Sequence, residues 1–309
     1  MGGANSQFHF ASAPVSWGIG DTPDAAWKQL PYQWVLDDIA AGGYSGTELG
    51  PYGYFSTDAE VLTGALAARH LTILSSFVPV PLSNPAAAEN VIQHVRRVGS
   101  LLASLGAKML VLADAQSPER MQLAGRVPVN GSRSLRAEQW RQVGAMVARV
   151  EQAAGEFGLG LVFHPHVATY VETVDEVQHF FEAVSSTGCG LCLDTGHCVY
   201  GGGDPVDEAR KYRSLLRYVH VKDIDASRLG EARRRRLDFG QAVAAGVFSQ
   251  VGQGCVCFSE FFRWLRAQAY SGWIVVEQDV KFGESAVAPR ESMRLSLDYL
   301  KGVVAGLGP

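Results

Sequence analysis

The stretch Gly190-Leu-Cys-Leu-Asp194-Thr-Gly-His197 is a short apolar run that ends in an acidic residue and then, one helical turn later, in a histidine. A short apolar run of this kind is typical of a buried strand in a parallel sheet. Two later runs end in the same way, namely Tyr218-Val-His220-Val-Lys222-Asp223 and Trp273-Ile-Val-Val-Glu277. Most strands end in turn residues. The repeated ending in Asp, His and Glu therefore indicates that these strand ends carry chemistry.

Five more runs of the same kind precede these three, and helical patterns separate them. The expected strands are 8–16, 46–49, 71–77, 109–113, 160–164, 190–194, 218–222 and 273–277. The expected helices lie near 31–41, 57–69, 86–105, 137–156, 174–186, 205–214, 258–268 and 287–304. Strict alternation of strand and helix predicts a parallel sheet, and eight repeats favour a closed (β/α)₈ barrel over an open sheet. We expect one α/β domain over residues 1–309.

Composition narrows the class of protein. The chain has 309 residues, 47% hydrophobic and 19% charged, which is typical of a globular protein with a large interior. Its formal charge of −4 argues against binding to nucleic acid, which favours a basic surface. We find no signal-peptide pattern and no apolar run long enough to span a membrane, so a cytoplasmic enzyme is expected.

Two connections are longer than a compact barrel needs, and both follow strand ends on the face where barrel active sites lie. They span residues 116–136 and 225–256. The second contains a basic run at 233–236, an apolar patch at 242–248 and two glycines at 252 and 254. We expect this segment to close over the site or to form a subunit interface, with the glycines as a hinge. The alternative is a static excursion packed on its own barrel.

The strand ends predict a metal site. Carboxylates that converge at a barrel mouth repel each other and lose hydration, and a divalent cation offsets that cost. The expected ligands are Glu172, Asp194, His220 and Glu277. Singly, three of them have a simpler interpretation: a helix N-cap for Asp194, a core histidine for His220, and an early-helix carboxylate for Glu172. Together they favour one divalent ion, Mn²⁺ or Co²⁺ first, with Mg²⁺ and Zn²⁺ also compatible.

The same blocks carry a family resemblance. Asp194-Thr-Gly-His197, His220-Val-Lys222-Asp223 and Val276-Glu277-Gln-Asp279 resemble the xylose-isomerase-like TIM-barrel superfamily of sugar isomerases and epimerases. Within it the chain is most similar to the inosose dehydratase group, nearly from end to end. The further blocks of the resemblance are Ala13-Pro-Val-Ser-Trp17-Gly, Gly43-Tyr-Ser-Gly-Thr-Glu48-Leu-Gly50, His164-Pro-His166, Gly202-Gly-Asp204-Pro, Gly246-Val-Phe248 and Gly252-Gln-Gly-Cys255.

The resemblance implies metal-assisted dehydration of a cyclic polyol ketone such as 2-keto-myo-inositol, through an enediolate. Two departures bear on it. Related barrels place a metal-binding Glu inside strand five, but 161–164 has no carboxylate, so Glu172 or a histidine must take that role. The segment 252–258 also lacks two acidic residues of the dehydratase pattern, so the substrate can differ.

The expected roles follow from these positions. The candidates for acid–base catalysis are Lys222, His166, His197 and Glu48; those for substrate binding are Trp17, Phe77, His164 and Asp223. Lys222 lies two residues after His220, so both point to one face of the strand, and we expect Lys222 to act on substrate. The alternative is an ion pair with a strand-end carboxylate. The main alternative is a ketose or inosose isomerase or epimerase with the same metal site. An abasic-DNA endonuclease and a barrel that binds sugar without catalysis are less favoured. Partners are expected to be a small polyhydroxylated ketone and, in an oligomer, further copies of this chain.

Overall fold

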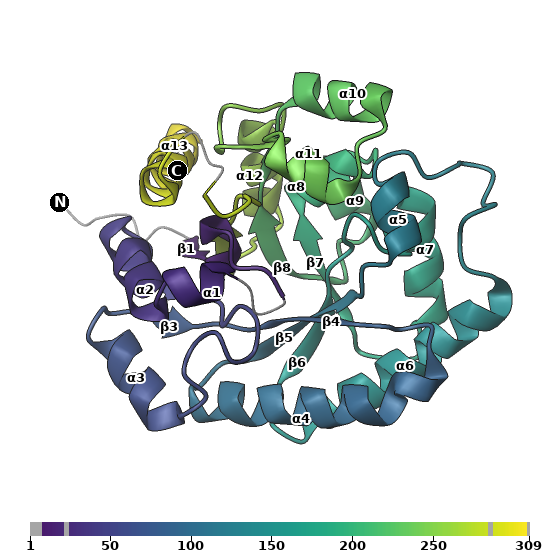
Figure 1. Ribbon diagram of the computed structural model, residues 1–309, viewed down its shortest axis with the longest axis horizontal. Helices are drawn as coiled ribbons and strands as arrows, with labels where there is room; N and C mark the ends of the chain where they lie inside the picture. Colours follow the sequence, from purple (N-terminus) through teal and green to yellow (C-terminus); the bar gives the residue numbers. More distant parts are fainter. Residues whose placement is uncertain (1–7, 22–24, 284–286, 308–309) are drawn as a thin grey trace.

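The computed structural model describes residues 8–21, 25–283 and 287–307, which form a barrel of parallel strands surrounded by helices (Figure 1). The barrel strands are β1 (His9–Ser12), β2 (Gly46–Thr47), β3 (Thr72–Ile73), β4 (Phe77–Val80), β5 (Met109–Asp114), β6 (Gly160–Phe163), β7 (Gly190–Asp194), β8 (Leu216–Val221) and β11 (Trp273–Val276). The predicted α/β class and barrel fold are confirmed.

Helices cover the outside of the barrel, and each expected helix has a counterpart. They are α2 (Tyr32–Ala41), α3 (Ala59–Ala67), α4 (Ala88–Ser104), α6 (Ala137–Gly155), α7 (Val174–Ala183), α9 (Pro205–Lys211), α12 (Phe258–Ala267) and α13 (Pro289–Gly306). Shorter elements are α1 (Ala25–Gln29), α5 (Pro118–Leu123), α8 (Thr195–Tyr200), α10 (Ala226–Arg235), α11 (Phe239–Ala244), 3-10 helices at Pro14–Trp17 and Pro85–Ala87, and the pair β9 (Asp223–Ile224) and β10 (Phe248–Ser249).

The strand order β3-β2-β1-β11-β8-β7-β6-β5-β4 describes an eight-stranded barrel, because β3 and β4 are two parts of one bent stretch. β3 pairs with β2, and β4 pairs with β5. Between them, the Ser75 carbonyl accepts from the Leu49 N–H at 2.9 Å and the Ser76 carbonyl accepts from the Val111 N–H at 3.0 Å. The expected single strand at 71–77 is therefore divided, and its bend links the two halves of the sheet.

The barrel closes between β1 and β11, which pair in parallel. The Ser12 hydroxyl donates to the Val276 carbonyl at 2.9 Å across this seam. β1 ends at Ser12, short of the expected residue 16, because Pro14 begins a 3-10 helix. The barrel interior is filled by side chains that include Ala11, Val162 and Tyr218, so the site at the mouth has a packed floor.

The helices follow from their sequence patterns. In α4, the side chains of Val91, Val95, Val98 and Leu102 recur at helical spacing and are all buried. The capping box that opens α7 is also present: the Thr173 hydroxyl accepts from the Glu176 N–H, and the Glu176 carboxylate accepts from the Thr173 N–H. Within the described residues, none of the helices has the length and apolar content that a membrane span requires.

The two long connections fold into short helices that lie beside the mouth (Figure 1). The first forms α5, and the second forms α10 and α11, with α5 and α11 in contact. The apolar patch at 242–248 is packed inside the chain, because Ala242, Val247 and Phe248 are buried against Tyr200 and Val167 in one cluster. The patch therefore has its packing partners within the chain. Movement of the segment and an oligomeric state stay predictions.

Candidate active site

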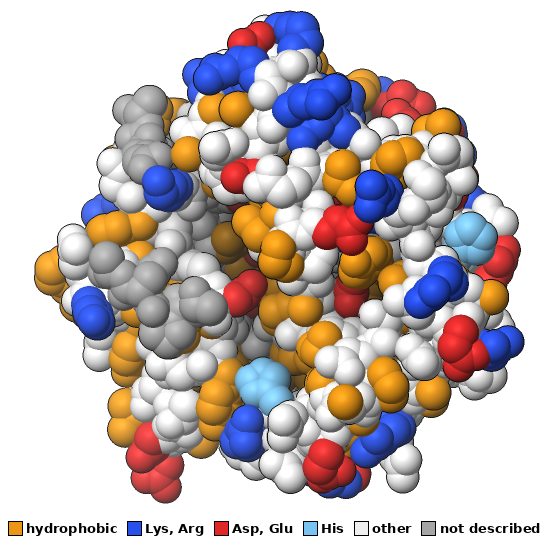
Figure 2. Space-filling view, turned by 45° about the vertical axis from the view of Figure 1, so that its right-hand side comes forward, with side chains coloured by type: hydrophobic (Ala, Val, Ile, Leu, Met, Phe, Trp, Pro, Cys, Tyr) orange, Lys and Arg blue, Asp and Glu red, His pale blue; other side chains and the backbone are white. Residues whose placement is uncertain are grey.

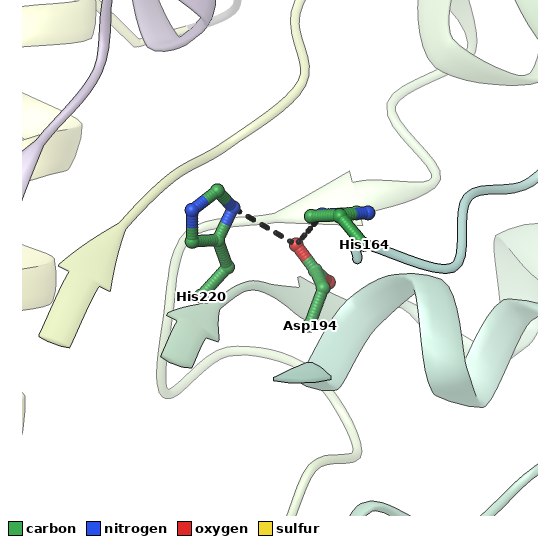
Figure 3. A group of neighbouring side chains, drawn as sticks. All are labelled: His164, Asp194 and His220. Carbon is green, nitrogen blue, oxygen red and sulfur yellow. Dashed lines mark hydrogen bonds and ion pairs between the residues drawn. The ribbon is translucent and has the colours of Figure 1, made fainter. Parts of the chain in front are cut away.

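Four strand-end side chains meet at the mouth of the barrel. His164 follows β6, Asp194 ends β7, His220 lies in β8 and Glu277 follows β11. Asp194 Oδ2 lies 3.3 Å from His164 Nε2 and 3.9 Å from His220 Nδ1, and it stands between the two imidazole rings in Figure 3. Glu277 Oε2 lies 3.2 Å from His220 Nδ1. All four residues are buried.

These spacings fit a metal ion. Ligand atoms about 2.0–2.2 Å from a tetrahedral ion are about 3.3 Å from one another. Among the described residues, His164, Asp194 and His220 form one group of donor atoms that could hold a metal, and Glu48, His220 and Glu277 form another. His220 Nδ1 has no hydrogen-bond partner of good geometry despite the nearby carboxylates. A buried nitrogen that faces two carboxylates and lacks a hydrogen bond is suited to bind a cation together with them.

Glu48, near the end of β2, orients His220. Its Oε1 accepts from His220 Nε2 at 3.0 Å and from the Ser75 hydroxyl at 2.7 Å. Burial opposes a charge on His220, but Cys192, Glu277 and Glu48 raise its pKa well above the usual value. A cation would therefore replace the proton on Nδ1, while Glu48 keeps its hydrogen bond to Nε2. His220 Nδ1 then faces Asp194 and Glu277. Glu48 therefore orients a histidine that could bind a metal. Glu48 also lines the cavity.

Lys222 supplies the positive charge of the site. Its Nζ lies 3.2 Å from Asp194 Oδ2, 2.8 Å from Glu277 Oε2 and 3.1 Å from Asp279 Oδ1. Burial opposes the charge, but these three carboxylates raise the pKa of Lys222 well above its usual value. Burial likewise opposes ionisation of Glu277, yet Lys222 and His220 lower the pKa of that carboxyl to about 2. The site is therefore built from ionised carboxylates around an ammonium group.

His164 is neutral. Burial lowers the pKa of its imidazole to about 4, against the opposing pull of Asp194. A neutral imidazole can act as a metal ligand, whereas an imidazolium cannot. This matters because β6 carries no carboxylate, and His164 is the side chain of that strand end that reaches Asp194.

Glu172 does not reach this group, and its assignment as a ligand needs correction. Its two carboxylate oxygens accept from the Gly125 N–H at 2.7 Å and the Ala168 N–H at 2.9 Å, and Arg120 lies 3.9 Å away. The side chain is buried and lines a smaller cavity than the one at the mouth. Glu172 thus accepts hydrogen bonds from backbone N–H groups of the loops. A histidine was the alternative to Glu172 for the strand-five ligand, and His164 lies at the mouth.

Two of the expected substrate-binding residues also lie elsewhere. Trp17 turns away from the mouth: its indole N–H donates to Asp38 at 3.0 Å, and the ring is buried in the core. The Asp223 carboxylate accepts backbone N–H groups of the 250–256 loop, from Gly252, Gly254 and Val256, each at 2.9–3.0 Å. Neither residue lines the cavity.

The cavity at the mouth has a volume of about 500 Å³. Glu48, His166 and Lys222 line it, as do Phe77 and His164, whereas His197 does not. The outer wall is apolar and comes partly from the helices of the long connections; its members include Ile19, Met121, Phe239, Val243 and Phe282. Figure 2 shows hydrophobic side chains gathered around the hollow of this face.

Sequence reasoning missed two contributions to this site. Asp279 binds Lys222 and lies near His197, and its spacing of two from Glu277 was a usable signal, because alternate residues of an extended chain share a face. Phe239 and Val243 had no such signal, since they reach the cavity only through the way α11 packs.

The fold and this group of side chains define a class: a parallel barrel with potential metal ligands at its C-terminal mouth. The chain matches the family described as xylose isomerase-like TIM barrel over residues 36–302, and it belongs to that family.

Similar proteins with assigned names support membership in this family. The chain is 30% identical over 298 residues to an inosose dehydratase of Geobacillus kaustophilus, covering 96% of this chain and 95% of the relative. It is 32% identical over 269 residues to the rhizopine catabolism protein MocC of Rhizobium meliloti, covering 86% and 80%. The chain is therefore an enzyme of this superfamily.

Solved structures show the shared fold. An L-ribulose 3-epimerase superposes with a TM-score of 0.71 at 15% identity, covering 96% of this chain and 95% of that one. The IOLI protein, solved with a zinc atom, superposes with a TM-score of 0.70 at 14% identity, covering 97% and 99%.

Proposed function

We propose that this enzyme is a metal-dependent dehydratase of a cyclic polyol ketone of the 2-keto-myo-inositol type. The observation that carries the proposal is the meeting of His164, Asp194 and His220 as one set of potential ligand atoms, with Glu277 Oε2 3.2 Å from His220 Nδ1, in a chain whose near full-length relatives include inosose dehydratases. These four residues would hold one divalent cation, which supplies Lewis acidity toward a substrate carbonyl. Their two imidazoles and two carboxylates suit Mn²⁺, Co²⁺ or Zn²⁺.

The protein's own groups account for the proton transfers. Elimination removes a proton from the carbon beside the ketone and a hydroxyl from the next carbon. Lys222 lines the cavity as an ammonium group, so it can hydrogen-bond to the leaving hydroxyl and give it a proton as water departs. The groups that line the cavity and can accept the carbon-bound proton are His166 and Glu48. The apolar wall from α5 and α11 excludes water from the reacting face.

A direct assay tests this function. Purified protein would be incubated with 2-keto-myo-inositol and Mn²⁺ or Co²⁺, while enone or dione absorbance and the product mass are followed. We expect loss of one water per turnover, and no reaction in His220→Ala. Exchange of the carbon-bound proton with solvent deuterium without loss of water would instead show an epimerase or isomerase, and would reject the dehydratase.

A further inference from the structure

The peptide groups of Val167 hold two histidines in opposite tautomers. The Val167 carbonyl lies 2.7 Å from His166 Nδ1, and the Val167 N–H lies 3.3 Å from His197 Nδ1. A carbonyl only accepts and a peptide N–H only donates. His166 must therefore carry its proton on Nδ1, which leaves the lone pair on Nε2. His197 must keep its lone pair on Nδ1, which places the proton of the neutral ring on Nε2.

The loop that carries Val167 is held firmly in place. The Ala168 N–H donates to Glu172 at 2.9 Å, and the Ala168 carbonyl accepts from the Ser117 N–H at 3.3 Å. The His166 N–H donates to the Val171 carbonyl at 3.1 Å. Both Val167 and Ala168 are fully buried. The Ala168 bond to Glu172 holds the peptide that carries the Val167 carbonyl, and the Thr169 hydroxyl, which donates to the His166 carbonyl at 2.7 Å, holds the peptide that carries the Val167 N–H. Both tautomers are therefore fixed by the fold.

The two rings have different surroundings. His166 lines the cavity between Phe77 and Phe239, whose rings lie 5.7 and 5.8 Å away. His197 packs against His166, with ring centroids 3.8 Å apart, and does not line the cavity. Its Nε2 lies 3.5 Å from Asp279 Oδ2.

Asp279 connects His197 to the cavity. Its other oxygen, Oδ1, lies 3.1 Å from Lys222 Nζ. His197, Asp279 and Lys222 therefore form a chain in which a ring N–H faces a carboxylate and the carboxylate faces the ammonium group.

The same tautomers bear on a third group of potential ligand atoms, from His166, His197 and Asp279, that could hold a metal. A metal at His197 Nε2 would need the ring proton on Nδ1, where it would oppose the Val167 N–H. The Val167 N–H therefore disfavours a metal at His197 Nε2, although among the described residues this nitrogen and Asp279 Oδ1 have no hydrogen bond of good geometry.

We propose that His166 is the histidine that contacts substrate, accepting a hydrogen bond from a substrate hydroxyl at Nε2, and that His197 is a positioning residue that acts through Asp279 on Lys222. This assignment rests on the proposed function for the identity of the substrate. The tautomers themselves follow from the hydrogen bonds alone.

Nitrogen NMR of the Zn²⁺-loaded enzyme tests the assignment without turnover, since Zn²⁺ is diamagnetic. The imidazoles would be ¹⁵N-labelled and the signals assigned with His166→Gln and His197→Gln. We expect the unprotonated nitrogen of His166 to be Nε2 and that of His197 to be Nδ1. Saturating myo-inositol, a polyol that lacks the reacting ketone, should shift the His166 Nε2 signal and leave His197 nearly unchanged. Reversed tautomers, or a polyol that shifts His197 or neither histidine, would overturn the proposal.

Two variants separate positioning from loop anchoring. His197→Gln places an amide N–H near the former Nε2, within reach of Asp279, but loses the acceptor for the Val167 N–H. His197→Asn keeps an acceptor near the former Nδ1 and loses the donor to Asp279. We expect His197→Gln to retain kcat within about tenfold, and His197→Asn to lose about 100-fold in kcat with little change in KM. The opposite ranking would show that His197 only anchors the loop.

The two experiments distinguish this inference from the proposed function. If 2-keto-myo-inositol is not dehydrated but the spectra and the polyol shift are as described, the proposed function fails and the histidine assignment stands. If dehydration occurs and the tautomers are reversed, the function stands and the assignment fails.

Discussion

His164 and Glu172 lie eight positions apart on one connection, yet their side chains have different partners. His164 leaves β6 toward the barrel axis and meets Asp194. Glu172 lies beyond the turn, and its oxygens are used by the N–H groups of Gly125 and Ala168. The two residues therefore offer a matched pair of substitutions that separates a metal ligand from a loop carboxylate.

We predict that His164→Gln lowers metal affinity by at least about tenfold, whereas Glu172→Gln leaves it near the native value. Elemental analysis after loading with Mn²⁺ and dialysis against a limiting concentration of free ion would measure both. Equal loss of metal in the two variants, or loss only in Glu172→Gln, would contradict the assignment of His164.

Lys222→Met should keep the metal and reduce turnover by roughly 100-fold, because it removes the only proton donor assigned to the leaving hydroxyl. Metal content and kcat would be measured together. Lys211→Met is the matched control, since Lys211 is exposed on α9, and it should behave like the native enzyme. Native-like turnover of Lys222→Met would refute the role.

The Glu172 carboxyl predicts a pH dependence of stability. Burial raises its pKa to about 7 from an ordinary value of 4.5, although two backbone N–H groups and Arg120 favour its ionised form. The folded state therefore holds this proton more tightly than the unfolded state. The resulting stabilisation is complete below pH 4.5 and is lost as the pH rises through about 7.

Glu172→Gln lacks this titration, so its free energy of unfolding should improve relative to the native protein between pH 5 and pH 8. The gain is on the order of 3 kcal/mol at most, from about 1.4 kcal/mol per pKa unit. Urea unfolding at the two pH values would measure it. A difference between the two proteins that stays constant with pH would rule out a raised pKa at Glu172.

At the scale of elements, the loop between β10 and α12 is organised by one carboxylate. Asp223 accepts the N–H groups of Gly252, Gly254 and Val256, and Gly252 has a left-handed φ of 93°. A Cβ at Gly254 would collide with the Asp223 carboxylate. Gly254 is thus required by its close approach to Asp223, and Gly252 by its left-handed φ and its close approach to the Tyr299 ring.

Asp223→Ala should destabilise the protein by about 3 kcal/mol or more, because several buried N–H groups lose their acceptor. Asp223→Asn, which keeps one acceptor oxygen, should cost less. Denaturant unfolding of both variants and hydrogen exchange at 250–256 would test this. Exchange that is unchanged in Asp223→Ala would show that the loop is held by other contacts.

The elements differ in how well their sequence predicts them. Strands such as β7 and β11 are continuous apolar runs, because both faces are buried, and their positions were predicted within a residue or two. The helices α10 and α11 were not predicted, because their few apolar residues contact other connections and give no regular pattern. Trp17 was assigned to the cavity from its position, but the 3-10 helix that begins at Pro14 turns it toward Asp38.

At the scale of the whole molecule, the fold and the main ligand group were predictable, since parallel strands must end at one mouth. For this reason the strand ends predicted that Asp194, His220 and Glu277 would lie close together, and Asp194 Oδ2 and Glu277 Oε2 lie 3.9 and 3.2 Å from His220 Nδ1. Their role as metal ligands stays a prediction. The completion of the group by His164 was left open, because sequence spacing does not show which side of a turn a side chain takes.

Because the ligand group joins β6, β7, β8 and β11, a bound ion should stabilise the whole barrel. A cation at about 100 times its Kd contributes about 2.7 kcal/mol. For a chain of this size we expect the unfolding midpoint to rise by about 5 °C with Mn²⁺ and to return with a chelator. Calorimetry would measure this shift, and His220→Ala is the control. An equal shift in that variant would show that the ion binds elsewhere.

The seam between β1 and β11 also ties folding to the direction of protein synthesis. Ser12 meets Val276 across 264 positions of sequence, and Glu277 follows directly. A nascent chain therefore cannot close its barrel, or complete the ligand group, until residues 273–277 have left the ribosome. Until then the edges of β1 and β8 lack their partner, and unpaired strand edges promote aggregation. These two edges are the surfaces that a chaperone would need to cover while translation is under way.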